Sequence, residues 1–381
     1  MSTPPPTSAG SIRTDWAAMA RELGPRLAAR AAGHDSDDSF VIDNYAELRE
    51  HRVFSAGVPA ELGGGGASHA ELCALLRIIA QFCSSTALAL SMHTHQVAVP
   101  VWRWCRERGP VEGLLRRIAA EELILVSSGG SDWLAGSGRA EKVDGGWRVT
   151  ARKIFSSGSP GGHLLMTTAV YKDPEAGPTV LHFPVPLDAP GVTILDNWRA
   201  LGMRGTGSND IVLDGVFVPE TAVAVRRPSG RWSPAFHLIY MIAFPLIYAV
   251  YVGIAERARD LAVQEAARKR DDPHVQLLVG EMDTELAAAR MALSSMIDTA
   301  ATAAPGLEAT NAVLIGRTMA GRAAVRTVEK AMEAVGGAAF FRGLGLERLW
   351  RDVQAARFHP LQEKPQSRYT GRLALGLDVD G

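Results

Sequence analysis

Residues 154–157, Ile-Phe-Ser-Ser, place an aromatic side chain directly before two hydroxyl groups. They end a stretch with a period of two, so we expect them on a β-strand, where alternate side chains share one face. An aromatic group with neighbouring hydroxyls suits a flat conjugated ring, because one packs on the ring and the others bond to its polar edge. Phe155, Ser156 and Ser157 are therefore candidates for a binding wall, with ordinary hydroxyls at a sheet edge as the alternative.

Histidines are the other candidates for chemistry. His93 and His95 lie in a nearly all-apolar stretch, TALALSMHTHQVAVPVWRW, which must be buried. A histidine in such a place either takes part in proton transfer or satisfies hydrogen bonds within the core, and the sequence leaves both interpretations open. His359 lies apart from them, in the segment Phe-His-Pro-Leu near the C-terminus.

Composition excludes several classes of protein. The 381 residues include 40 Lys and Arg against 41 Asp and Glu, a net charge of −1, so no basic excess exists to bind nucleic acid. The three cysteines are far apart and form no Cys-x-x-Cys pair, which predicts no metal site, no disulfide framework and a cytoplasmic location. Residues 1–14 are polar and rich in Pro and Ser, which predicts a disordered tail rather than a signal peptide.

The elements that must position these residues fall into three predicted domains. Residues 15–122 have helical periodicity, residues 123–228 have a period of two with a hairpin signal at Asp144-Gly145-Gly146, and residues 229–381 are helical again. The apolar run 236–255 is long enough to span a membrane, but its polar residues and its continuation into an amphipathic helix favour a buried helix. The predicted class is α+β: an N-terminal helical domain, a central β-barrel or sandwich and a C-terminal four-helix bundle.

Four segments, in the expected order, resemble the acyl-CoA dehydrogenase superfamily over residues 15–375. They are VPAELGGGG, then SSGGSDWLAG with WRVTARKIFSSG, then LGMRGTGSNDIVLDGVFVP, and finally EAVGGAAFFRGLGLERLWRDVQAARFHP. Each segment alone is a weak signal, but all four together with the helix–strand–helix order are specific. The resemblance implies an oxidoreductase that uses a flavin, FAD or FMN.

The resemblance also implies the residues that contact the flavin. On the strands of the β domain they are Ser127, Ser131, Phe155, Ser156 and Ser157. Near the phosphates and adenine they are Arg268, Glu333, Gly336 and Gly337, some of them contributed by a neighbouring subunit. We accordingly expect a homotetramer or homodimer, because the bundle helices carry more apolar surface than one subunit can cover.

Two departures from the family pattern bear on the reaction. An acyl-CoA dehydrogenase needs a carboxylate to remove the α-proton of its substrate. The position of that carboxylate is occupied by Pro360 here, and the position used in other branches by Ala243. Glu363 lies three residues beyond the expected point and is more typical of a solvated charge.

The second departure is ARKRDDPHVQ (267–276), which keeps Arg268 but lacks the family's Phe-Gly clamp, while Glu333 replaces a neutral amide. Both changes predict weaker, exchangeable flavin binding. They favour a two-component monooxygenase, which receives reduced flavin from a separate reductase, uses O2 on a small metabolite and needs a hydrogen-bond donor beside the reacting oxygen.

Candidate catalytic residues for that reaction are His359, His93, His95 and Ser157. The alternatives are a dehydrogenase of acyl-CoA or acyl-carrier-protein thioesters with a relocated base, and a non-enzymatic scaffold.

Overall fold

The computed structural model describes residues 14–128, 130 and 132–380. The N-terminal part is helical, with helices α1 Trp16–Asp37, α2 Ile42–Glu50, α3 His69–Phe82, α4 Ser84–Glu107 and α5 Glu112–Glu121. α3 begins at a capping box, in which the Ser68 hydroxyl accepts from the Glu71 amide and the Glu71 carboxylate accepts from the Ser68 amide. This cap ends the glycine-rich turn at residues 63–66 and starts a helix whose apolar side packs in the core.

The central part is one sheet whose strands follow the order β6-β7-β3-β2-β4-β5-β8, with β1 alongside β4. The strands are β1 Leu125–Ser127, β2 Arg139–Val143, β3 Gly146–Lys153, β4 Leu164–Asp173, β5 Gly177–Pro186, β6 Val192–Ile194, β7 Ile211–Pro219 and β8 Val225–Pro228. The predicted hairpin joins β2 to β3 through Asp144 and Gly145, and Gly145 has a φ of +76°. Glycine adopts that conformation without strain, which explains why the signal is reliable.

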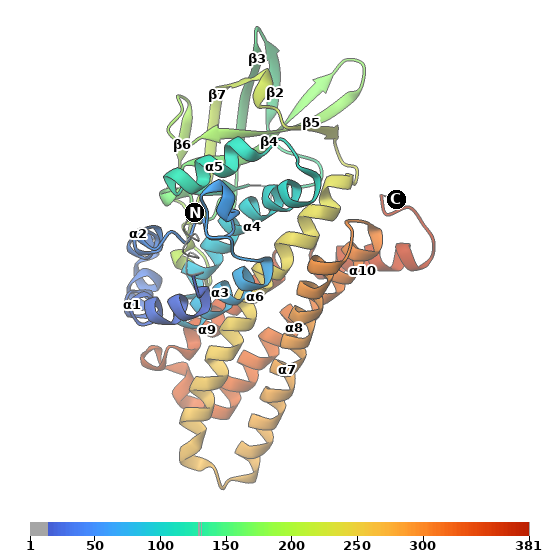
Figure 1. The fold of residues 1–381 in the computed structure, drawn as a ribbon. Helices are drawn as coiled ribbons and strands as arrows, with labels where there is room; N and C mark the ends of the chain where they lie inside the picture. The colour runs from blue at the N-terminus through green and yellow to red at the C-terminus, as the bar shows by residue number, and fades with distance from the viewer. Residues whose placement is uncertain (1–13, 129, 131, 381) are drawn as a thin grey trace, which may run out of the picture.

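The C-terminal part is helical, with helices α6 Pro234–Ala266, α7 Pro273–Thr302, α8 Leu307–Val335, α9 Leu346–Val353 and α10 Glu363–Ala374. Three of these helices are long and antiparallel, whereas the expected fourth long helix is replaced by the shorter α9 and α10. α6 has the length and composition of a membrane span, but 89% of its most apolar window is buried inside the protein, as predicted for a core helix. Figure 1 shows the sheet at one end of the molecule and the α6–α7 turn at the other. The predicted α+β class, with helical, sheet and helical parts in that order, is confirmed.

The sheet domain is joined to the helices by close backbone contact. A Cβ added to Gly202 would lie 2.4 Å from the carbonyl oxygen of Arg351, so these two segments touch without an intervening side chain. The Arg351 guanidinium also forms an ion pair with Asp35 of α1 at 2.6 Å. α9 therefore holds the loop before β7 and the first helix in one arrangement.

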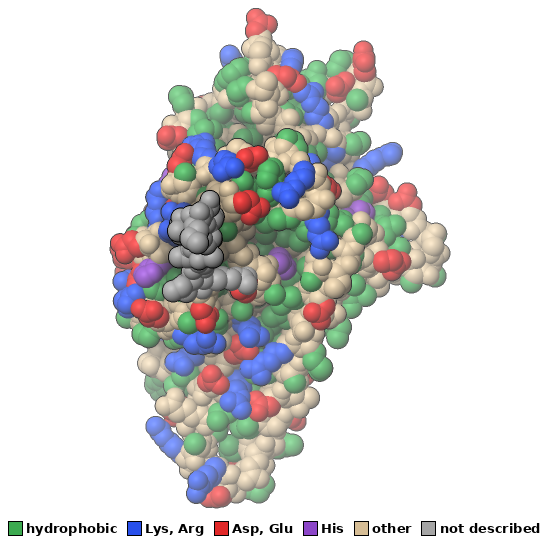
Figure 2. All heavy atoms as spheres, viewed as in Figure 1, with side chains coloured by type: hydrophobic (Ala, Val, Ile, Leu, Met, Phe, Trp, Pro, Cys, Tyr) green, Lys and Arg blue, Asp and Glu red, His purple; other side chains and the backbone are tan. Residues whose placement is uncertain are grey.

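Charges of both signs are interspersed on the face that Figure 2 shows, without a large area of one sign. Some apolar side chains of the C-terminal part are nevertheless exposed. Met291 on α7 is 66% exposed, and the consecutive residues Phe340 and Phe341 are 83% and 70% exposed. Single exposed apolar residues are ordinary, but neighbouring aromatic rings at such exposure are typical of an interface.

Candidate active site

The turn that follows β3 presents Phe155 to the outside. β3 ends at Lys153, so the prediction of a strand through Ser157 is wrong: Phe155 has a φ of +57°, which breaks the alternation and turns its ring outward. Phe155 is 50% exposed, and its ring centre lies 5.9 Å from that of Trp198. On its other side, a Cβ added to Gly130 would lie 3.6 Å from the Cβ of Phe155. An exposed aromatic ring between a glycine and a tryptophan suits a flat ligand.

The two serines after Phe155 point in different directions. Ser156 is fully buried and its hydroxyl has no hydrogen-bond partner within the described residues. Ser157 is partly exposed, and its Oγ lies 2.7 Å from the Oγ of Ser208. The backbone of this turn is held by the loop before β7, because the Ser156 amide donates to the Asn209 carbonyl and the Gly158 amide donates to the Thr206 carbonyl. The amides of Ser156 and Gly158 are therefore not free to bind a ligand here.

The loop after β1 lies next to this turn. Ser127 ends β1 and is 9% exposed, and Ser128 shares a hydrogen bond of 2.7 Å with Thr167. Ser131, also predicted to contact flavin, lies outside the described residues. The following part of the loop is anchored by a buried ion pair of 2.9 Å between Lys153 and Asp132. This pair fixes the end of β3 and the loop after β1 against each other.

His93 is a core histidine whose two ring nitrogens are both occupied. Its Nδ1 accepts from the Leu125 amide at 2.9 Å, and its Nε2 lies 2.8 Å from the Phe54 carbonyl oxygen, to which it donates. Burial lowers the pKa of His93 to about 4, so the ring stays neutral. These contacts hold α4 against the start of β1, and no nitrogen remains for a reactant.

The neutral state of His93 predicts a loss of stability in acid. An unfolded histidine has a pKa near 6.5, so lowering the pH from 7 to 5 protonates the unfolded chain but not the folded His93, whose pKa is about 4. The free energy of unfolding should fall by about 2 kcal/mol from this residue alone. In His93→Gln, whose amide can donate and accept at the same places, that part of the decline should vanish in urea titrations at pH 7 and 5. His274→Gln, at an exposed position, should decline as the wild type does; an unaltered decline in His93→Gln would contradict the argument.

His95, two residues nearer the end of α4, is also buried. Its Nδ1 donates to the Ser91 carbonyl at 3.1 Å and its Nε2 lies 3.1 Å from the Gln96 amide nitrogen. Burial lowers the pKa of His95 to about 4. Both nitrogens are again in use, so the interpretation of a satisfied core residue fits His93 and His95 better than a catalytic role.

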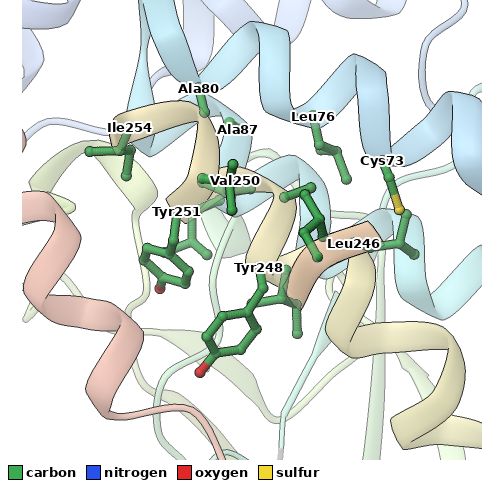
Figure 3. Packing of buried hydrophobic residues seen from close by; sticks show 14 of the residues in the cluster. Cys73, Leu76, Ala80, Ala87, Leu246, Tyr248, Val250, Tyr251 and Ile254 are labelled. Carbon is green, nitrogen blue, oxygen red and sulfur yellow. The ribbon is translucent and has the colours of Figure 1, made fainter. Parts of the chain in front are cut away.

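His359 has a different environment. Its Nε2 lies 2.5 Å from the hydroxyl of Tyr251 on α6, and the two ring centres are 5.6 Å apart. In Figure 3 the Tyr248 and Tyr251 rings, both fully buried, point away from Cys73 and Leu76 of α3. Burial lowers the pKa of His359 to about 3, and the nearby Arg317 charge contributes to the shift. His359 is therefore neutral.

The contact with Tyr251 bears on which nitrogen of His359 carries the proton. Burial raises the pKa of the Tyr251 hydroxyl, so it keeps its proton and can donate it to Nε2 of His359. If Nε2 accepts, the proton of the neutral ring is on Nδ1, which is then a donor. Arg317 secures the segment, because its Nη2 donates to the His359 carbonyl at 2.7 Å and to the Ala356 carbonyl at 3.3 Å.

The positions at which the resemblance would place a catalytic carboxylate contain none. Pro360 has no ionisable group, and Ala243 is buried within α6. Glu363 forms an ion pair with Arg322 at 2.5 Å on the surface, which lowers its pKa. It is a solvated charge, as its sequence context indicated, and its carboxylate is committed to Arg322.

The Phe155–Ser157 turn and the His359 segment are connected through Met203. The Trp198 indole donates to the Met203 carbonyl at 3.1 Å, and the Met203 amide donates to the Asp352 carboxylate at 2.5 Å. Asp352 is fully buried, and burial raises its pKa to about 6. Arg351 and Asp352 belong to a segment that resembles the family, but the sequence did not indicate this bridge. It did not indicate Tyr251 either, because a tyrosine in an apolar run is typical of core packing.

The remaining predicted flavin residues lie elsewhere. Arg259 of α6 pairs with Asp283 of α7 and Lys330 of α8 with Glu281 of α7, so the end of α6 and the end of α8 lie together at the α6–α7 turn. That end of the bundle is opposite the sheet (Figure 1). The residues concerned are Arg268, which is exposed and paired with Glu265, together with Glu333, Gly336 and Gly337.

Comparison with known families gives three consecutive matches. The acyl-CoA dehydrogenase N-terminal domain matches residues 14–111, the middle domain residues 127–216 and the C-terminal domain residues 246–363. Together they cover the helical, sheet and helical parts of the fold in the order in which the structure has them.

Characterised relatives match along nearly the whole chain. L-evernosamine nitrososynthase of a Micromonospora species is 30% identical over 93% of this chain and 89% of its own. Amino sugar nitrososynthase DnmZ of Streptomyces peucetius is 32% identical over 92% of this chain and 91% of its own. The structure of KijD3 in complex with FMN and dTDP-3-amino-2,3,6-trideoxy-4-keto-3-methyl-D-glucose superimposes with a TM-score of 0.88 at 30% identity, covering 98% of this chain and 97% of that one.

Proposed function

The chain belongs to the acyl-CoA dehydrogenase family and is a flavin-dependent oxidoreductase, and from that premise we propose that it is a monooxygenase that oxidises the amino group of a small molecule. One observation carries the choice of reaction. Beside the position where a dehydrogenase has its base, this chain has a neutral histidine, His359, whose Nε2 contacts the Tyr251 hydroxyl. In our proposal the tyrosine donates to Nε2, and Nδ1 carries the proton of the ring. A neutral donor cannot remove an α-proton, but it can stabilise charge that develops on a reacting oxygen.

The residues around Phe155 fit a flavin. The exposed ring supplies a packing surface, and Ser157 is partly exposed beside it. The buried Ser156 hydroxyl has no partner among the described residues, so its polar capacity is not used there. Phe155, Ser156, Ser157 and Ser127 would hold the ring, and Ser131 belongs to the same proposal. When bound in its reduced form, the flavin supplies the two electrons that oxygen insertion requires.

We take FMN as the cofactor, with FAD as the alternative. FMN has no adenine, and this chain lacks the Phe-Gly clamp that the family uses for it. KijD3, which is 30% identical and matches over 97% of its own chain, has been crystallised with FMN. Four of the predicted residues would reach a flavin only from a second chain, and a protein that binds FMN could dispense with them: Arg268, Glu333, Gly336 and Gly337.

A pair of substitutions tests both the site and the cofactor. Ser157→Ala should weaken the binding of dithionite-reduced FMN about fivefold, the equivalent of one hydrogen bond of about 1 kcal/mol, as measured by anaerobic ultrafiltration. Arg268→Ala should leave the Kd for FMN unchanged, as measured by quenching of flavin fluorescence. If Arg268→Ala weakens FAD binding while FAD binds more tightly than FMN, the cofactor is FAD; unchanged affinity for both flavins in Ser157→Ala would remove the site from this turn.

The substrate we propose is a nucleotide-linked amino sugar, because relatives at 30–32% identity are nitrososynthases of amino sugars and KijD3 has been crystallised with a dTDP-linked one. The first oxidation balances as R–NH2 plus O2, two electrons and two protons, which gives R–NHOH and water. In this chain His359 would donate from Nδ1 to the oxygen, Tyr251 would hold its ring, and Arg317 would fix the backbone.

The decisive experiment mixes the purified protein with FMN, a chemical reductant, a nucleotide-linked amino sugar and 18O2. We expect one 18O atom in the amino sugar product, detected by mass spectrometry. Reduction of the flavin by an acyl-CoA in the absence of oxygen would instead support the dehydrogenase alternative.

Three further proposals accompany this function. Reduced flavin would come from a separate reductase. The exposed apolar side chains of α7 and of residues 340–341 would be covered in a homotetramer or homodimer. The three cysteines are free, which supports a cytoplasmic location.

A further inference from the structure

A chain of three hydroxyl groups runs inward from the Phe155–Ser157 turn. The Oγ of Ser157 lies 2.7 Å from the Oγ of Ser208, which in turn lies 2.6 Å from the Oγ1 of Thr206. Thr206 Oγ1 donates to the Met203 carbonyl at 2.9 Å. Ser157 is partly exposed, whereas Ser208 is 4% and Thr206 0% exposed. This hydroxyl relay therefore has one open end, at Ser157, and one closed end, at a carbonyl.

The closed end gives the relay a direction, because a carbonyl can only accept. When Thr206 donates to Met203, Ser208 donates to Thr206 and Ser157 donates to Ser208, so all three protons are used inside the protein. If each hydroxyl instead donated toward Ser157, no proton would lie between Thr206 Oγ1 and the Met203 carbonyl, and the protein would make one hydrogen bond fewer. The Met203 carbonyl accepts from the Thr206 amide and the Trp198 indole in either case, so the two directions differ by that single bond.

We propose that this relay makes Ser157 a hydrogen-bond acceptor toward the ligand and thereby selects reduced over oxidised flavin. The inference rests on the proposed function, which places a flavin against this turn. A reduced flavin carries an N–H at N5, whereas N5 of an oxidised flavin is itself an acceptor. Lone pairs on Ser157 complement the first and repel the second. The sequence predicted Ser157 as a donor, and the relay gives it the opposite role, with Ser208 and Thr206 as positioning residues.

The test compares the Kd of the full-length protein for oxidised FMN with its Kd for dithionite-reduced FMN, both measured anaerobically by ultrafiltration. The ratio of the two should exceed one in the wild type. In Ser208→Ala the proton of Ser157 loses its internal acceptor and becomes free to donate, so the ratio should fall at least fivefold, the equivalent of one hydrogen bond of about 1 kcal/mol. Thr206→Val removes the closed end and should change the ratio in the same direction.

Ser159→Ala is the matched control, because Ser159 is buried in the same turn and its hydroxyl donates to the Gly207 carbonyl outside the relay. This variant should keep the wild-type ratio. A ratio that Ser208→Ala and Thr206→Val both leave unchanged, in proteins with wild-type circular dichroism, would overturn the relay while leaving the proposed function intact. Failure of the wild type to bind FMN in either redox state would overturn both.

Discussion

Replacing His359 with alanine is expected to lower the rate of amine oxidation about 10²–10⁴-fold, the range over which a positioned proton donor contributes to catalysis. The expectation follows from the contact of 2.5 Å with the buried Tyr251 hydroxyl, which in the proposed arrangement donates to Nε2 and leaves Nδ1 as the donor of the ring. The measurement is the single-turnover rate of 18O transfer at saturating FMN and substrate. Substrate and FMN affinities should change little, because the donor acts on the reacting oxygen.

Two companion variants make that result specific. Tyr251→Phe should reduce the rate less than His359→Ala does, and it should have no further effect when combined with His359→Ala, since the tyrosine acts through the histidine. Glu363→Ala should retain the wild-type rate, because its carboxylate is paired with Arg322 on the surface. A wild-type rate in His359→Ala, or a large loss in Glu363→Ala, would contradict the assignment of the donor.

The largest effect on stability is expected for Gly253→Ala. Gly253 lies where α6 crosses α3, and an added Cβ would lie 2.1 Å from the Arg77 carbonyl oxygen and 2.9 Å from the Cβ of Ala80. Both neighbours belong to a rigid helix, so α3 and α6 must separate and their packed side chains lose contact. We expect a loss of about 3 kcal/mol in the free energy of unfolding, the upper end for overpacked cores.

Gly280→Ala is the matched control for this substitution. Gly280 also lies inside a helix, α7, but it is exposed and an added Cβ would meet nothing within 4 Å. There alanine should stabilise the protein by about 0.5–1 kcal/mol through helix propensity alone. Urea midpoints at one protein concentration would measure both, and equal effects of the two substitutions would show that the α3–α6 contact does not limit stability.

Local patterns in the sequence were sufficient to predict most of the helices and strands. The change of period marked where strands replace helices, and Asp144-Gly145 located the β2–β3 hairpin, because both signals depend on neighbouring residues alone. The same reasoning identified α6 as a core helix. It missed β8, a strand of four residues at 225–228, since so short a segment has little periodicity.

The site was predictable only in part. The sequence indicated Ser127, Ser131 and residues 155–157 as candidates, but it did not indicate the outward turn of Phe155, because a phenylalanine gives no sign that it will adopt a positive φ. His93 and His95 could not be distinguished from reactive histidines until their partners were known. Tyr251 pairs with a residue 108 positions away, and no local pattern predicts a contact of that separation.

The position of the α6–α7 turn, at the end of the molecule opposite the sheet, has an evolutionary consequence. A cofactor that ends at its first phosphate would make no demand on that turn, so selection for nucleotide recognition would be relaxed there. Insertions, deletions and charge changes could accumulate around Arg268 without loss of turnover, provided that the helices on either side keep their packing. In a set of orthologues this turn should vary in length as freely as an ordinary surface loop, whereas residues 201–208 should scarcely vary at all.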